Sequence, residues 1–145
     1  MNFGKYFLMI AGFCFIVQSC CKEICGDENI FALEFQGFGI TDLEKIKIVR
    51  YTQDDFNKPL DSFTVSMNNV TIKDTTLVYL DSPLNSDFDF KINLENPSLT
   101  YSLSDFQVEK ENCRCSGGTF KKIAGFKLNG IQRSTHSYYP LEIKK

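Results

Sequence analysis

The chain has 145 residues, of which 43% are hydrophobic, and it carries 16 basic and 18 acidic side chains, giving a formal net charge of −2 at pH 7. This length suits one ordinary domain. The basic residues are scattered along the chain, which argues against a nucleic-acid partner because a phosphate-binding protein concentrates them on one surface.

The first element is an export signal at residues 1–19. Lys5 supplies a positive charge, the apolar run of residues 6–17 follows, and the small residue Ser19 precedes a cysteine, which is the arrangement of a secretory signal peptide. The apolar run of about 12 residues is shorter than the roughly 20 that a membrane-spanning helix requires. The segment is therefore expected to be removed from the mature protein.

The end of the signal, Val17-Gln18-Ser19-Cys20, resembles the bacterial lipobox and makes Cys20 the expected lipidation site. Acyl chains such as palmitate on its thiol and on the new amino terminus would provide the several chains that stable anchoring requires. The membrane is then a partner through this anchor, and the bacterial outer membrane is the expected location. Lys22-Glu23 partly resembles a surface-export signal, so the domain is expected to face either the periplasm or the cell surface. The alternative is a plain signal peptide with Cys20 as a disulfide partner.

Cleavage before Cys20 leaves 15 basic against 18 acidic side chains. Residues 20–29 are polar and are predicted to form the lipidated amino terminus and a tether. Residues 30–145 are predicted to form a single β-sandwich domain.

Period-two alternation of apolar and polar residues predicts strands at 30–39, 62–67 and 87–94. The last of these has the cleanest pattern and is expected to pack on the core. Thr41-Asp42-Leu43-Glu44 matches a helix-capping box, but the β-branched residues that follow favour a strand through Tyr51. Polar residues 52–61 are interpreted as a loop.

Turn residues divide the rest of the chain. Asn68-Asn69 predicts a hairpin to residues 70–72, and residues 75–80 are predicted to be a strand buried on both faces that ends at Asp81-Ser82-Pro83. Gly125 predicts a bulge or bend within a strand at 119–128. Asn129-Gly130 is the strongest hairpin signal, and residues 138–143 are a candidate edge strand.

These elements predict an all-β fold, namely an antiparallel β-sandwich of about seven to nine strands, with a closed β-barrel as the alternative. The lipobox, Arg50-Tyr51, the DFDFKI and YSLSDF strands, the Cys-x-Cys corner and the final FKLNG hairpin together resemble the small envelope lipoproteins of Bacteroidota. That resemblance implies an immunoglobulin-like or transthyretin-like sandwich. It transfers no catalytic residue.

Four cysteines remain in the mature chain besides the one expected to be lipidated: Cys21, Cys25, Cys113 and Cys115. Export places them in an oxidising compartment, so at least one disulfide is expected between the tether and the Cys-x-Cys corner. Closing this loop of roughly 90 residues would stabilise the fold by about 4 to 5 kcal/mol, less any strain. A four-thiolate zinc site is the alternative, although the cysteine spacing differs from the usual one.

The chemical motifs are weak, so neither a metal nor a cofactor is expected. His136 is the only histidine and lacks the local motif of a catalytic triad. Residues 85–89 imitate a calcium loop, but Phe90 and Asn96 occupy positions that require Gly and Glu. The alternating Asp residues of this segment are therefore interpreted as the solvent face of a strand.

Two functions remain open. The first is a non-enzymatic envelope module that binds a protein or a glycan, with Tyr138 and Tyr139 as candidates for stacking on a ligand. The second is a small hydrolase, such as a glycosidase, that uses loop carboxylates such as Asp54-Asp55. A carboxyl group with a raised pKa inside a pocket would favour the enzyme.

Overall fold

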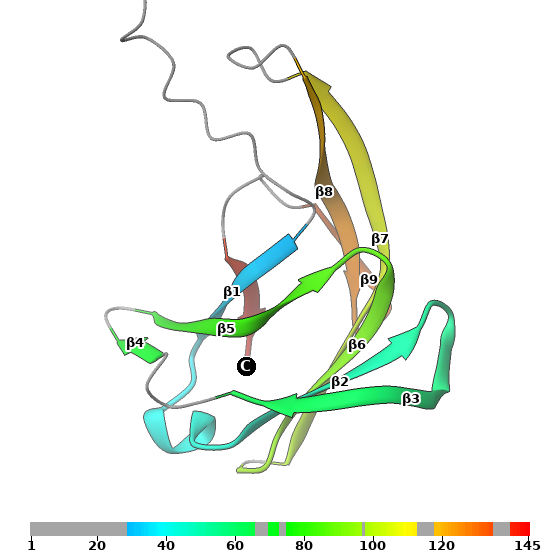
Figure 1. Ribbon diagram of the computed structural model, residues 1–145. Coiled ribbons are helices and arrows are strands. Elements are labelled where there is room, and N and C mark those ends of the chain that lie inside the picture. The colour runs from blue at the N-terminus through cyan, green and yellow to red at the C-terminus, as the bar shows by residue number, and fades with distance from the viewer. Residues whose placement is uncertain (1–28, 66–69, 73–74, 97, 113–117, 135–139) are drawn as a thin grey trace, which may run out of the picture.

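The computed structural model describes residues 29–65, 70–72, 75–96, 98–112, 118–134 and 140–145. These residues form ten strands in two sheets (Figure 1). The four-stranded sheet has the order β10-β1-β5-β4, and the six-stranded sheet has the order β3-β2-β6-β7-β8-β9. The two sheets do not close into a barrel, so the predicted all-β sandwich is confirmed.

The shorter sheet consists of β1 (Asn29–Gln36), β4 (Val70–Ile72), β5 (Thr76–Asn85) and β10 (Leu141–Lys144). The longer sheet consists of β2 (Ile46–Thr52), β3 (Asp55–Thr64), β6 (Phe88–Leu94), β7 (Leu99–Asn112), β8 (Thr119–Leu128) and β9 (Ile131–Ser134). All pairings are antiparallel except that of β10 with β1, which is parallel. Ten strands slightly exceed the expected seven to nine, because three of them contain only three or four residues.

The core lies between the sheets and follows the period-two pattern of the sequence. On β6, Phe90, Ile92 and Leu94 are buried, as predicted from this strand's alternation. On β1 of the opposite sheet, Leu33 and Phe35 are buried in the same way. One face of each strand therefore closes the core, since successive side chains point to opposite faces of a sheet.

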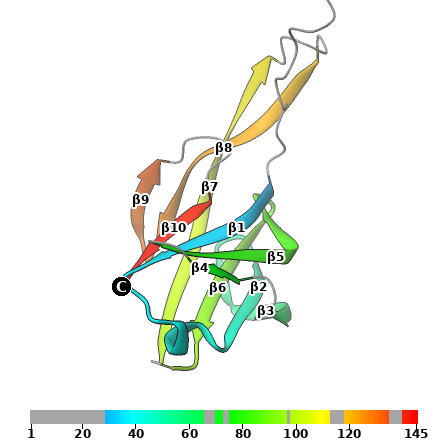
Figure 2. The same ribbon diagram turned by 90° about the vertical axis from the view of Figure 1, so that its left-hand side faces the viewer.

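The hairpin at Asn129-Gly130 is confirmed. Asn129 and Gly130 have φ values of 51° and 78°, which is the conformation of a two-residue type I′ turn. Gly125 also has the predicted role, because the register of β7 against β8 shifts beside its partner Gln107. The two strands of this pairing continue past the rest of the sandwich as a long ribbon (Figure 2).

Several predictions about residues 41–64 were wrong. Residues Ile40–Leu43 form a short 3-10 helix instead of strand. The expected loop at 52–61 is largely the strand β3, which begins at Asp55 after a tight turn in which Asp54 has a φ of 61°. β3 is an edge strand, and an edge tolerates the polar residues and Pro59 that suggested a loop.

Predictions for residues 63–85 also failed. The hairpin expected to join 63–67 to 70–72 is absent from the described pairings, because β3 pairs with β2 whereas β4 pairs with β5 in the other sheet. β5 is buried on one face only, since Tyr79 is 48% exposed. It also continues through Ser82 and Pro83, which were expected to end it.

Candidate functional site

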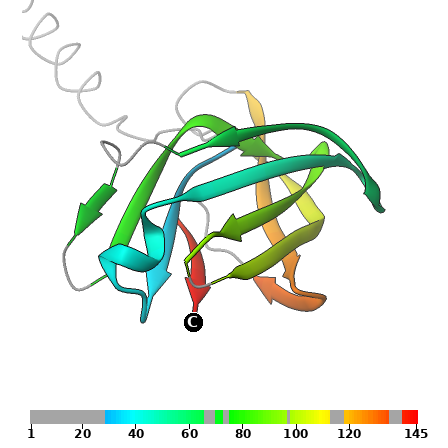
Figure 3. The ribbon, with the colours of Figure 1, turned by 90° about the horizontal axis from the view of Figure 1, so that it is seen from below.

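The candidate site is a groove along one side of the sandwich, where the longer sheet extends past the shorter one. The hydroxyl of Tyr101 on β7 donates a hydrogen bond to the carbonyl of Lys144 at 3.4 Å, so β10 lies over β7. Beyond β7 the longer sheet continues with β8 and then β9, so these two strands extend past β10, the last strand of the shorter sheet. Viewed from below, β10 lies beside β1 with β8 and β9 on its other side (Figure 3).

The groove has a volume of about 610 Å³. Its walls come from both sheets: Phe126, Leu128 and Ile131 from the longer one, and Leu141 from β10. Phe126 pairs with Arg133 and Leu128 pairs with Ile131 across the β8–β9 ladder. Because paired residues share a face of a sheet, Ile131 and Arg133 lie on the inner face, as Phe126 and Leu128 do.

Exposure changes sharply along this inner face. Phe126 is 4% exposed, whereas Ile131 on the next strand is 60% exposed. Apolar side chains on the inner face of a sandwich are normally covered by the opposite sheet. Here the shorter sheet ends before it reaches β9, so a large apolar side chain and an arginine remain open to solvent.

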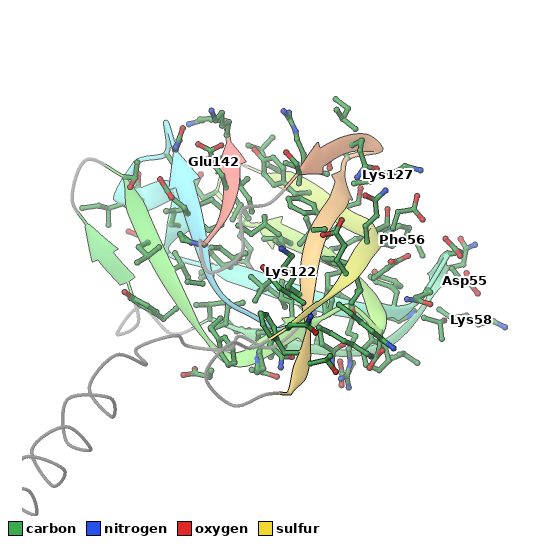
Figure 4. The ribbon with its side chains drawn as sticks, turned by 90° about the horizontal axis from the view of Figure 1, so that it is seen from above. Asp55, Phe56, Lys58, Lys122, Lys127 and Glu142 are labelled. Atoms are coloured by element: carbon green, nitrogen blue, oxygen red, sulfur yellow. The ribbon has the colours of Figure 1, made fainter. Side chains whose placement is uncertain are left out.

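Charged groups surround the apolar part of the groove. On β10 the Lys144 Nζ lies 3.3 Å from the Glu142 Oε1, and on β1 Glu34 accepts a hydrogen bond from the Gln36 side chain at 3.2 Å. Arg133 also lines the groove, and its guanidinium forms no ion pair with any described carboxylate. Glu142 lies on β10, well away from Asp55 and Lys58 at the end of the β2–β3 hairpin (Figure 4). At Arg133 the groove can therefore bind a negatively charged group of a ligand that packs on the apolar wall.

The carboxylate of Asp89 is a second notable feature, and it corrects a prediction. Asp89 was expected on the solvent face of β6 but is only 1% exposed. It accepts a hydrogen bond at 2.9 Å from the backbone N–H of Asp54, in the turn between β2 and β3. Burial raises its pKa, while this hydrogen bond lowers it and the nearby carboxylates of Asp54 and Asp105 raise it.

Asp89 does not form a site accessible to a substrate in the described part of the structure. It lines none of the described pockets. The turn that binds it also attaches to the β5–β6 turn through Gln53, whose side-chain amide donates to the Ser86 carbonyl at 2.9 Å. Asp105 forms an ion pair with Lys127, and this pairing raises the pKa of Lys127. The described geometry supports a structural role for Asp89, which holds the β2–β3 turn against β6.

Apart from the carboxylates Asp54 and Asp55 at the β2–β3 turn, the residues predicted as sites from the sequence lie outside the described residues. These are the lipidation site Cys20, the disulfide candidates Cys21, Cys25, Cys113 and Cys115, the stacking candidates Tyr138 and Tyr139, and His136. The segment that contains both tyrosines connects β9 to β10, the two strands that border the groove. No group of three or more potential metal ligands occurs among the described residues.

Sequence reasoning missed Ile131 and Arg133. The only signal was their spacing from the Asn129-Gly130 turn, which places them opposite Leu128 and Phe126 and hence on the inner face. No helix in the described part of the chain is long and apolar enough to cross a membrane. Comparison with protein-family models, curated proteins and solved structures found no match to the chain.

Proposed function

We propose that this protein is a bacterial envelope lipoprotein, anchored by lipid on Cys20, whose β-sandwich is a non-catalytic module that binds a protein or glycan partner. The observation that carries the binding role is the groove beside β10, where inner-face residues of β9 are left uncovered. A sizeable concave surface with apolar walls and a few charged groups is the usual form of a binding site.

The electrostatics of the groove favour binding over catalysis. General acid–base catalysis needs a carboxyl group positioned toward the substrate, whereas the described acids of the groove, Glu34 and Glu142, interact with the side chains of Gln36 and Lys144. The carboxyl group whose pKa is raised by burial, Asp89, is not part of the groove lining.

A photocrosslinking amino acid at Ile131 tests the binding role in intact cells. Ile131 is 60% exposed inside the groove, and Leu60, which is 50% exposed on the edge strand β3, provides a matched control. We expect a discrete covalent adduct from position 131 and none from position 60. Adducts of the same size and yield from both positions, or none from either, would contradict a partner in the groove.

Mass spectrometry of the native amino-terminal peptide tests the anchor. The peptide should begin at Cys20 and carry acyl chains, and Cys20→Ser should release the protein from the membrane fraction. An unmodified peptide that begins elsewhere would contradict lipidation. Protease treatment of intact cells should remove the domain if it faces the surface and leave it intact if it faces the periplasm.

The proposed lipoprotein also has a disulfide that joins the tether to the Cys-x-Cys corner. Non-reducing peptide mapping should yield a linked pair that contains Cys21 or Cys25 with Cys113 or Cys115. Four alkylatable thiols in oxidised, metal-free protein would contradict this disulfide.

A further inference from the structure

We propose that the groove takes an extended segment of a partner protein, which pairs with the free edge of β10 and adds a strand to the shorter sheet. This inference rests on the proposed binding function and specifies the partner as a polypeptide with alternating apolar residues and a carboxylate. Strand addition to an exposed sheet edge is a general mode of peptide recognition.

The first argument comes from the backbone of β10. Gln36 of β1 pairs with Lys144, and the N–H of Lys145 donates to the Gln36 carbonyl at 3.1 Å. Successive residues of an extended strand direct their backbone groups to opposite sides. Ile143 and Lys145 therefore bond to β1, whereas Glu142 and Lys144 direct their N–H and C=O groups into the groove. The bond from the Tyr101 hydroxyl to the Lys144 carbonyl agrees with this assignment.

The second argument comes from the inner face of β8 and β9. A strand added to β10 would extend the shorter sheet over Ile131, whose side chain is 60% exposed. Alternate side chains of that strand would face Leu128 and Ile131, so apolar residues are required at every second position. A strand added to β9 instead would extend the longer sheet outward and leave Ile131 uncovered.

The third argument concerns charge. Arg133 lines the groove on the same inner face, without an ion pair to a described residue. An arginine binds a carboxylate through two parallel hydrogen bonds, so the incoming strand should carry Asp or Glu at a position facing Arg133.

The other sheet edges are less suitable. β3 contains Pro59, and its register against β2 shifts at two places, which are features that discourage pairing with a further strand. β4 contains three residues. Among the described edge strands, β10 is the one that directs backbone groups into the groove and lies beside an uncovered part of the opposite sheet.

The experiment is a selection of phage-displayed random nine-residue peptides on the full-length chain in detergent micelles, followed by fluorescence anisotropy of the best synthetic peptide. We expect enriched peptides to alternate apolar residues and to contain an acidic residue. Glu142→Pro removes an N–H that faces the groove but no bond to β1, and it should weaken peptide binding by about tenfold. Glu142→Gln, which keeps the N–H, measures the contribution of the side chain and should weaken binding less than Glu142→Pro. Leu60→Ala, on β3 outside the groove, is the unchanged control and should stay within about twofold of the parent. Arg133→Glu should select basic peptides instead of acidic ones.

A peptide variant tests the backbone pairing without altering the protein. N-methylation of alternate peptide residues should abolish binding when the methyl groups face β10 and preserve it when they are shifted by one residue. This arm decides the question if circular dichroism shows that Glu142→Pro is unfolded. Equal binding by the two methylated peptides, or no enrichment over empty micelles, overturns the strand proposal.

A further outcome separates this proposal from the binding function on which it rests. If an envelope polysaccharide binds the chain, loses binding in Ile131→Asp, and no peptide binds, the strand proposal fails while a binding groove remains. If neither a polysaccharide nor a peptide binds and position 131 yields no adduct in cells, the proposed function fails as well.

Discussion

The longer sheet is covered by the shorter sheet at β6 but extends past it at β9, although each of these two strands places an isoleucine on the inner face. Ile92 on β6 and Ile131 on β9 both point to the inner face, yet Ile92 is 0% and Ile131 is 60% exposed. The difference arises because the shorter sheet ends at β10. Periodicity thus determines which face of a strand is apolar, whereas the opposite sheet determines whether that face is core or binding surface.

The largest expected effect contrasts these two isoleucines directly. Ile92→Ala should lower the free energy of unfolding by about 2 to 4 kcal/mol, because it removes buried methyl groups and leaves a cavity. Ile131→Ala should change it by less than about 0.5 kcal/mol. Urea denaturation followed by circular dichroism measures both. Similar losses for the two variants would mean that Ile131 is covered in the free protein.

The next effect concerns the Asn129-Gly130 turn, which joins β8 to β9 in the part of the longer sheet that extends past the shorter one. Gly130 has a φ of 78°, and a Cβ atom there would meet nothing within 4 Å, so Gly130→Ala would strain the backbone without a steric clash. We expect a loss of about 1 kcal/mol in the free energy of unfolding. Gly39→Ala is the control: Gly39 has a φ of −80°, and an added Cβ would lie 3.8 Å from the Thr41 Oγ1. A loss at position 39 as large as that at position 130 would refute the conformational explanation.

A smaller effect belongs to the covered region, where Asp89 is buried. Because burial raises the pKa of Asp89 above its value of 3.8 in the unfolded chain, folding favours the protonated form. Stability should therefore rise as the pH falls from the folded-state pKa toward 3.8, and it should be lower but constant at higher pH.

Asp89→Asn should abolish this part of the pH dependence while changing the free energy of unfolding at pH 7 by about 1 kcal/mol or less. Denaturation curves at several pH values provide the measurement, with exposed Asp87→Asn as the matched control. A pH profile that is the same in Asp89→Asn and in the parent would contradict the assignment.

The smallest effect tests how β10, the wall of the groove, is held at its end. The Lys145 Nζ lies 2.7 Å from the Asp42 Oδ2, and the backbone N–H of Gly39 donates to the same oxygen at 3.0 Å. These interactions lower the pKa of Asp42, so the pair contributes stability above the unfolded pKa that is lost as the pH falls through the folded pKa. NMR titration of Lys145→Met should show the pKa of Asp42 shifted upward. An unchanged value would mean that Gly39 alone stabilises the carboxylate.

Much of the fold could be predicted because it depends on local rules. The alternation in β6 and the Asn129-Gly130 turn each specify a conformation within a few residues, and both were predicted. The failures involve choices between distant partners. β4 follows β3 in sequence but pairs with β5, and the polar residues of β3 form a strand because β2 is available beside them.

The candidate site likewise depends on contacts between distant segments, which local rules do not predict. Sequence reasoning selected Tyr138 and Tyr139, which lie outside the described residues, and it did not identify Arg133 or Ile131. It placed Asp89 on the solvent face because alternation alone cannot reveal that a neighbouring turn covers a polar side chain.

The sequence by itself determined the all-β character, the inner and outer face of most strands, and the turn that joins β8 to β9. These depend on side-chain periodicity and on backbone preferences of a few adjacent residues. The tertiary structure alone decided that β10 ends the shorter sheet over β7, that Ile131 and Arg133 remain uncovered, and that Asp89 is buried. Those properties depend on contacts between segments far apart in the chain, because burial is a relation between two surfaces and each strand encodes only one of them.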